Sequence, residues 1–451
     1  MQKPLIAVLL ASAFSLHAQA ADLLQVYQQA LANDATYASA RASAAAGRER
    51  ITQGRAGLLP TVGVTGEVTR VKNDQASWNE GQIIDPNDPF STVQGNEGSA
   101  TTKSYTISLQ QPLFRWDRWE TYQQSKLQQA ISEAQFAQAQ QDLIVRVAQA
   151  YFDVLAAQDT LESTRAQKVA TTEQLASAKR NFEVGTQTIT DTHEAQAAYD
   201  LVVSQELAAV NDLENKKTAL QAIIGTAPAA LATLRTGVAL TAPQPANVDQ
   251  WVSAAENQNY AVSVAQLQLE SAKRDISKNR AGHYPTLDLV AASRHSRTDG
   301  QTYFSGRQTG NSVGVQYSIP IFQGFAVTSR VRESIALEDK ARNDLEANRR
   351  NAALTARQSF LGVNTGMAQV KALEAAEVSS NSALESNKLG YQVGVRINID
   401  VLNAQRQLYQ TRTDLAKARY NTILAGLRLK AAAGSLREED LQPVNALLQQ
   451  P

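Results

Sequence analysis

The spacing of hydrophobic residues changes from a helical period to an alternation, and this change occurs twice along the chain. Residues 22–57 and 247–282 have the spacing of helices. After Pro60 the pattern becomes an alternation, with Val62, Val64 and Val68 on one side of the backbone. A period of two is typical of strands that turn an apolar side to a core or to lipid. We therefore predict a helix followed by strands in each half of the chain.

The alternating runs form two predicted strand pairs, at 60–112 and 285–320. Each run is about ten residues long, the length of a tilted strand that crosses a bilayer. The polar side of these runs includes Glu67, Asp288 and Gln316, which suits a water-filled lumen.

Four strands per chain cannot close a barrel around a channel, and open strand edges cannot face lipid. Either the strands form half of a small soluble sandwich, or several chains pool them. Three chains would supply about 12 strands, and a barrel of that size has a lumen. The pattern favours pooling and leaves the sandwich as the alternative.

Two long stretches without proline follow the strands, one from Pro112 to Pro228 and one from Pro320 to Pro443. Proline breaks helices, so its exclusion predicts two very long helical hairpins. A helix of about 65 residues is roughly 100 Å long at 1.5 Å per residue, a length that matches a periplasm. Ordinary coiled-coil hairpins are the alternative to a helical tube wall. The predicted hairpins run over 116–182 and 190–224 with a break at Gly185, and over 327–389 and 399–433 with a break at Gly394.

The two halves match each other at nearly constant offsets. Segment 51–61 aligns with 276–286, an offset of 225 (276−51), and Val184-Gly185 aligns with Val393-Gly394, an offset of 209 (393−184). The difference falls in the Asn-, Asp- and Gly-rich loop before Pro112, and loops accept insertions readily. We therefore predict a first repeat at 21–230, with its hairpin at 113–226, and a second at 231–451, with its hairpin at 321–434 and a C-terminal segment at 435–451.

The first 20 residues have the three parts of a secretory signal peptide. Lys3 supplies the positive charge, residues 5–16 are almost wholly apolar, and Ala18-Gln19-Ala20 is a small-residue cleavage site. The apolar run is shorter than the roughly 20 residues of a spanning helix. We therefore predict a cleaved signal at 1–20 and a mature protein outside the cytosol.

Composition narrows the classes of function. The 43 basic and 43 acidic residues balance, whereas a nucleic-acid partner favours a basic excess. Cysteine is absent, so neither disulfides nor thiolate ligands are expected. His193 lacks the second histidine of a zinc-binding helix, and Gly306 and Gly310 are expected in a loop between strands rather than before a helix. We expect no enzyme activity, no cofactor and no metal site.

The candidate functional residues flank the two helix breaks. Thr190 and Asp191 follow the first break, and Asp400 follows the second. One interpretation is helix capping, because Thr and Asp accept hydrogen bonds from free amides. The other is that the breaks are the far tips of a tube, where acidic residues from symmetric copies form a ring that attracts cations. Tyr391 and Arg396 flank Gly394 and could bond Thr190 or Asp191 on the neighbouring hairpin.

Motifs spread over the mature sequence resemble the TolC family of outer-membrane efflux and secretion channels. They include Asp22-Leu-Leu-Gln-Val-Tyr-Gln-Gln-Ala30, Gly57-Leu-Leu-Pro60, Tyr151-Phe-Asp-Val-Leu155, Arg180-Asn-Phe-Glu-Val-Gly185, Gly282-His-Tyr-Pro-Thr-Leu-Asp-Leu289, Gly390-Tyr-Gln-Val-Gly394, Ala418-Arg-Tyr-Asn421 and Pro443-Val-Asn-Ala-Leu-Leu448. So many matches in the same order make the resemblance specific.

The resemblance implies an α+β membrane protein: a homotrimer with a 12-stranded β-barrel in outer-membrane lipid, four strands per chain, continued by a long α-helical tunnel. It implies a passive exit duct of an efflux pump or type I secretion system, docked to a periplasmic adaptor (membrane fusion) protein and an inner-membrane transporter of the RND or ABC type. Drugs, a secreted protein or both remain open as cargo, and a plain porin or a structural coiled-coil trimer are the rival functions.

The family's periplasmic gate positions are occupied here by Thr190, Asp191, Tyr391 and Arg396. Its tunnel-tip acidic ring maps onto Asp400. The second position of that ring is Asn403 in this chain, so one layer of charge is missing.

Overall fold

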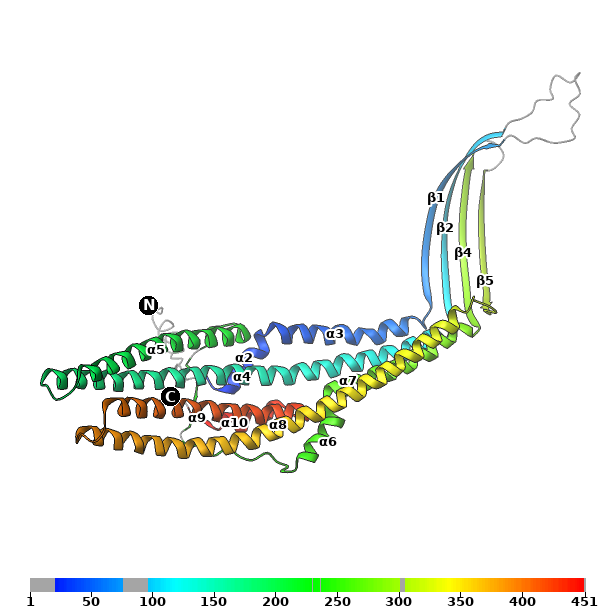
Figure 1. Ribbon diagram of the computed structural model, residues 1–451. Coiled ribbons are helices and arrows are strands. Elements are labelled where there is room, and N and C mark those ends of the chain that lie inside the picture. The colour runs from blue at the N-terminus through cyan, green and yellow to red at the C-terminus, as the bar shows by residue number, and fades with distance from the viewer. Residues whose placement is uncertain (1–20, 76–95, 229, 236, 301–304, 450–451) are drawn as a thin grey trace, which may run out of the picture. The chain divides into compact units, whose positions relative to one another are not determined.

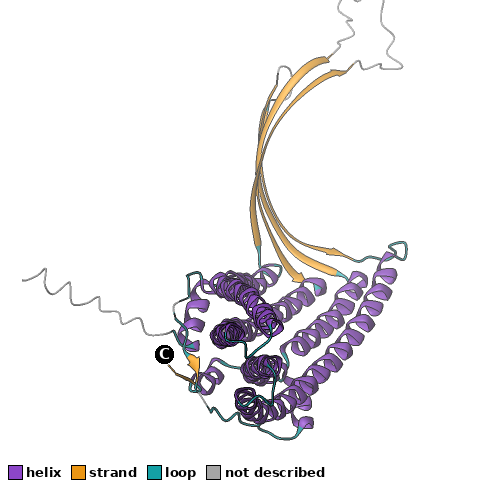
Figure 2. Ribbon diagram, turned by 60° about the vertical axis from the view of Figure 1, so that its left-hand side comes forward, coloured by secondary structure: helices purple, strands orange, loops and turns teal. Residues whose placement is uncertain are grey.

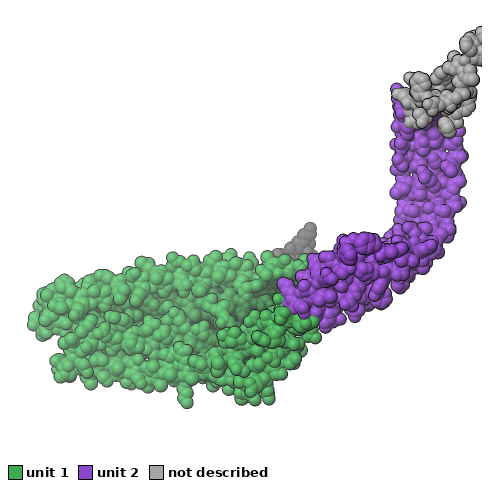
Figure 3. Space-filling model, turned by 45° about the vertical axis from the view of Figure 1, so that its right-hand side comes forward, with its two compact units in different colours: residues 1–46, 131–267, 342–451 green, residues 47–130, 268–341 purple. Residues whose placement is uncertain are grey.

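The computed structural model describes residues 21–75, 96–228, 230–235, 237–300 and 305–449. The predicted signal peptide and most of the loop before Pro112 lie outside these residues. Two compact units make up the chain (Figure 3): residues 1–46, 131–267 and 342–451 form unit 1, and residues 47–130 and 268–341 form unit 2. Each unit draws on both sequence repeats, so the division of the chain near residue 230 stays a prediction.

Unit 2 contains one antiparallel sheet in the order β1-β2-β4-β5, which is curved (Figure 2). Its strands are β1 (Thr61–Gln75), β2 (Asn96–Phe114), β4 (Thr286–Gly300) and β5 (Gly306–Ser318). They are longer than the expected ten residues, with 13 residues in β5 and 19 in β2. The expectation that Gly306 and Gly310 lie in a loop was wrong, because both pair with β4 in strand β5.

The predicted alternation gives this sheet two unlike faces. We call the outer face the one that carries Val62, Val64, Val313 and Val315; Val64 is 69% exposed and Val313 78% exposed. The opposite face is mostly polar. Asp288 lies on this polar face but is only 3% exposed, because the Arg115 guanidinium donates to both of its carboxylate oxygens, with Nε 3.1 Å from Oδ1. This carboxylate is therefore bound to protein rather than open to a lumen.

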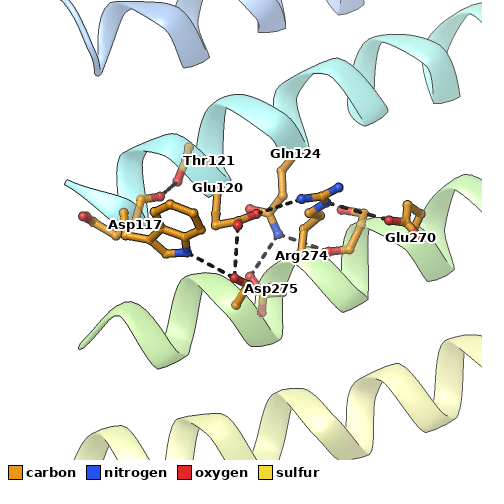
Figure 4. Close-up of polar contacts among 10 residues, drawn as sticks. Asp117, Glu120, Thr121, Gln124, Glu270, Arg274 and Asp275 are labelled. Atoms are coloured by element: carbon orange, nitrogen blue, oxygen red, sulfur yellow. Dashed lines mark hydrogen bonds and ion pairs between the residues drawn. The ribbon is translucent and has the colours of Figure 1, made fainter. Parts of the chain in front are cut away.

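Helix ends in unit 2 are joined by a polar cluster around the buried carboxylate of Glu120 (Figure 4). Helix α4 (Trp116–Glu183) supplies Glu120, which accepts from Ser277 Oγ at 3.0 Å and lies 3.6 Å from Arg274 of helix α7 (Tyr260–Arg280). Gln124 donates to Asp275 at 3.2 Å beside it. A buried carboxylate is tolerated only with such partners, since removing one leaves an uncompensated charge.

The two long hairpins are confirmed close to their predicted bounds (Figure 1). Helix α4 is followed by α5 (Ile189–Ile224), and α8 (Ala326–Gln392) by α9 (Asn398–Ala432). Among the described residues, no helix combines the length and the apolar character needed to cross a lipid bilayer.

The prediction of one continuous helix before each strand pair was wrong. The first is divided into α2 (Leu23–Asn33) and α3 (Ala35–Ala56), the second into α6 (Val248–Gln258) and α7, with a short 3-10 turn η1 (Ala281–His283) after it. The breaks lie at Asp34 and Asn259, which are equivalent at the offset of 225 (259−34). Each side chain accepts from a backbone amide of the next helix, at 2.6 Å from Tyr37 and 2.9 Å from Ala261. These local bonds compete with a continuous helix.

The main hydrophobic core of unit 1 lies where helices α2, α4, α5 and α9 meet the C-terminal segment. That segment contains η2 (Glu438–Asp440), α10 (Leu441–Asn445) and β6 (Leu448–Gln449), which pairs with β3 (Thr233–Leu234). Tyr151 and Phe152 are almost fully buried there, and the Tyr151 hydroxyl donates to the Ala232 carbonyl at 2.8 Å. Burial raises the pKa of the Tyr151 hydroxyl, which therefore remains a neutral donor.

Candidate functional site: the tips of the two helical hairpins

Both hairpin tips lie at the same end of unit 1 and begin with the same backbone motif (Figure 1). Gly185 and Gly394 end α4 and α8 in the left-handed region, at φ 76° and 80°. The amide of the next residue bonds back across the turn, Thr186 to Asn181 and Val395 to Gly390, each at 2.9 Å. This is the Schellman arrangement, which favours glycine because it has no Cβ. It explains why Val-Gly recurs in the two repeats.

The first tip starts its second helix with a capping box. Thr188 is the N-cap of α5, and its hydroxyl accepts from the Asp191 amide at 3.3 Å. The Asp191 carboxylate accepts in turn from the Thr188 amide at 3.1 Å and from its hydroxyl at 2.7 Å. Capping therefore describes Asp191 within one protomer. Thr190 directly precedes Asp191 in the first turn of α5 and is exposed.

The second tip has no such box. Its N-cap is Ile397, which offers no side-chain acceptor, so Asp400 is not held as Asp191 is. Arg396 lies 3.7 Å from the Asp400 carboxylate, and its side chain is 59% exposed. The Arg396 side chain crosses closely over Gly390, where an added Cβ would lie 2.7 Å from its Cγ. Asn403 lies one turn further along α9 and is exposed.

Two uncharged amide side chains link the tips inside one protomer. Gln187 donates to the Tyr391 hydroxyl. Asn398, with 0% exposure, donates to the Asp191 carbonyl at 3.0 Å and accepts from Gln174 at 2.7 Å. The predicted residues Tyr391 and Asp191 thus take part in a small network of separate bonds between the tips. Among the described residues, no hydrogen bond joins Arg396 to Thr190.

Sequence reasoning missed Gln187 and Asn398, although a signal was present. At the offset of 209, Gln187 is equivalent to Arg396 (396−187) and Asn398 to Ile189 (398−189). Both are departures from the repeat beside the breaks. A departure that places a buried amide where the other copy has isoleucine indicates a specific partner, because burying an amide without one is costly.

Small apolar clusters support this network. Leu402 of α9 packs with Leu175, Ala178 and Ala195 of the first hairpin. Tyr391 packs beside Leu384, Val401 and Leu408 of the second hairpin. The tips therefore combine apolar packing with polar bonds between the hairpins. Among the described residues, no group of three His, Cys, Asp or Glu side chains could hold a metal ion there or elsewhere.

The chain matches the model of the family "Outer membrane efflux protein" over residues 26–226 and 251–435. It is 34% identical to outer membrane protein TolC of Escherichia coli, over 99% of this chain and 89% of that protein. It is 31% identical to proteases secretion protein PrtF of Dickeya chrysanthemi, over 98% of this chain and 95% of that protein. In fold it is similar to the Campylobacter jejuni CmeC outer membrane channel, with a TM-score of 0.77 at 17% identity, over 95% of this chain and 90% of that chain.

Proposed function

The chain belongs to the outer membrane efflux protein family, and we propose that three copies form the outer-membrane exit duct of a tripartite efflux pump or type I secretion system. The duct conducts cargo passively across the periplasm and the outer membrane. The likeness to TolC and to the secretion protein PrtF over almost the whole chain supports this role. The family is one of channels, and we propose no enzymatic activity.

The described sheet is the observation that carries the proposal. Its outer face exposes Val62, Val64, Val313, Val315 and Tyr317, as a lipid-facing surface does. Strands β1 and β5 are its two edges. Unpaired edges cannot face lipid, so a sheet with this outer face needs the edges of further copies to close. We propose that β5 of one protomer pairs with β1 of the next.

Cysteine cross-linking tests this assembly, and the natural chain offers a background without cysteine. Single cysteines placed along β1 are combined with single cysteines along β5 and oxidised in native membranes. We expect a covalent trimer at one register and none when both cysteines lie in the same strand. Recovery of monomers only, at every register, would refute the shared barrel.

We propose that the hairpin tips form the periplasmic gate, with Thr190, Asp191, Tyr391 and Arg396 as its bonding residues. Arg396 supports this role because it is exposed and held only loosely, 3.7 Å from Asp400. In the closed trimer it would bind Thr190 or Asp191 of the neighbouring hairpin. Asp400 would form an acidic ring at the tip, weakened by the neutral Asn403 at its second position.

Planar-bilayer recording tests the gate. We expect small, mostly closed conductance for the natural protein and a larger one when Arg396 or Tyr391 is replaced by alanine. A wide-open natural pore would favour the porin. Absence of conductance in both forms would favour a structural trimer.

A periplasmic adaptor and an inner-membrane transporter of the RND or ABC type complete the proposed assembly. Co-purification of the protein from its own membranes tests both partners, and the transporter that is recovered would identify drugs or protein as cargo. We further propose that residues 1–20 are removed on export and that the mature chain consists of repeats at 21–230 and 231–451.

A further inference from the structure

The outer face of the sheet changes from apolar to basic along its strands. Three cations stand side by side in successive strands: Lys103 of β2 lies opposite Arg297 of β4, and Arg297 lies opposite Arg307 of β5. We call these residues the basic row. All three are exposed. Like charges directly opposite each other destabilise a strand pair, so this arrangement indicates an anion that lies outside the chain.

Only one member of the basic row has a carboxylate partner among the described residues. Asp299 accepts from Arg297 at 3.0 Å. No described carboxylate pairs with Lys103 or Arg307. Two further cations, Arg70 and Lys72, lie on the same face of β1. Three cations of the basic row thus share one printed carboxylate partner, and Arg70 and Lys72 add positive charge beside it.

The opposite face of the same strands has no such row. At the level next to the basic row it carries Ser104, Ser296 and Gln308, with Glu67 on β1, and its one cation among the described strand positions is Arg294 of β4. A general enrichment of cations near the strand ends would place a row on both faces. The basic row is therefore a property of the outer face, the one that carries the apolar side chains.

The spacing between the basic row and the other end of this face fits a lipid bilayer. Tyr317 of β5 is 74% exposed and lies ten residues along the strand from Arg307 of the basic row (317−307). Ten residues span about 33 Å, which a strand tilt of about 40° reduces to about 25 Å, the height of an apolar band. On β2, Tyr105 lies two residues from Lys103 on the same face and stacks on His295. On β2 the basic row begins where the apolar residues end, whereas on β5 the polar residues Thr309 and Asn311 lie between Arg307 and Val313.

We infer that the basic row binds the phosphate groups of an anionic lipid in the leaflet at the end of the sheet where β1 and β4 end and β2 and β5 begin. This inference rests on the proposed membrane-spanning sheet. The arginine guanidinium donates two parallel hydrogen bonds to a phosphate, and the lysine adds a point charge. The lipid chains would lie along the apolar residues of the same strands, so one molecule contacts both parts of the outer face.

Lipid retention in native mass spectrometry tests this site on the intact assembly. The protein is reconstituted in phosphatidylcholine with added phosphatidic acid, whose headgroup is a phosphate monoester. A basic side chain at a charged membrane surface contributes about a fivefold factor in affinity. We expect the variant K103Q/R297Q/R307Q to lose preference for phosphatidic acid by on the order of 100-fold, and R307Q alone by about fivefold.

Arg294 provides the matched control, because it lies in β4 on the polar face. Its replacement by glutamine removes the same charge as R297Q or R307Q does. R294Q should leave the lipid preference unchanged. Equal retention of both lipids by the natural protein, or an equal loss in R294Q and R307Q, would overturn the inference. Displacement of the lipid by the same concentration of inorganic phosphate would assign the site to a soluble anion and would overturn it too.

Conductance recorded from the same proteoliposomes separates this inference from the proposed duct. A conducting trimer without lipid preference would overturn the basic row and leave the duct intact. Lipid preference in a protein that conducts nothing would refute the duct, while the basic row would stand.

Discussion

The two hairpin tips share a backbone and differ in how their side chains are held. Each begins with a glycine in the left-handed region, followed by the same backbone hydrogen bonds of a Schellman turn. In the first tip, the polar groups at the start of α5 are then paired within the tip, because Thr188 and Asp191 bond each other. The second begins its helix at Ile397 without a side-chain cap. The two repeats thus share the same turn, but substitutions have given the first tip a side-chain cap and left the second without one.

Replacing Asn398 by isoleucine should have the largest effect on this comparison, because it gives the second tip the residue of the first. Asp191 and Gln174 would lose their buried partner, at a cost of about 2–3 kcal/mol. We expect a lower thermal midpoint of the reconstituted protein and a larger bilayer conductance. The reverse change, I189N, should be nearly neutral because Ile189 is exposed. Equal effects of the two changes would contradict the assigned role of Asn398.

Replacing either tip glycine by alanine should cost about 1–2 kcal/mol, because both adopt the left-handed region. No atom lies within 4 Å of the added methyl group at Gly185 or Gly394, so the cost is conformational in both cases. We therefore expect G185A and G394A to lower the free energy of unfolding by similar amounts in urea titrations. A large difference between them would show that the turns are not equivalent.

Removing the cap of the first tip should cost about 1 kcal/mol. T188A deletes the hydroxyl that bonds Asp191 and leaves α5 with a free amide. The matched change I397T introduces the missing cap in the second tip and should stabilise it. Amide hydrogen exchange of the first turns of α5 and α9 would report both changes. Faster exchange at α9 in I397T would speak against the capping difference.

Replacing Arg396 by glutamine, its equivalent in the first tip, should change stability by no more than about 0.5 kcal/mol. The side chain is exposed and its ion pair with Asp400 is screened by solvent. Conductance should nevertheless rise, because the proposed bonds to the neighbouring hairpin are lost. K388Q, which removes a half-buried cation of α8 beside the same tip, is the control. A rise of equal size in K388Q would assign the effect to net charge.

Most of the fold was predictable because its signals are local. Absence of proline marks the long hairpins, Gly185 and Gly394 mark their breaks, and a period of two marks the strands. The breaks at Asp34 and Asn259 were missed because neither proline nor glycine marks them. Only the side-chain bonds to the next helix reveal these two breaks.

The site was predictable only in part, for a related reason. Asp191 accepts from Asn398 and Tyr391 accepts from Gln187, and in each bond the two partners lie on different hairpins, about 200 residues apart in the chain. Spacing along the sequence cannot identify such a partner. Asp288 shows the same limit, because strand alternation places it on the polar face without indicating that Arg115 covers it.

The central pairing of β2 with β4 has a consequence for biogenesis. Ile107 lies opposite Ser293, which the ribosome adds 186 residues later (293−107). Until then the β1–β2 hairpin has no third strand, and an isolated hairpin is marginally stable in water. The chain must therefore stay open, with the valines of its outer face uncovered, until β4 has been exported, which is about two thirds of the chain. A holding chaperone would act in that interval, and truncation before β4 should leave a protein that never inserts.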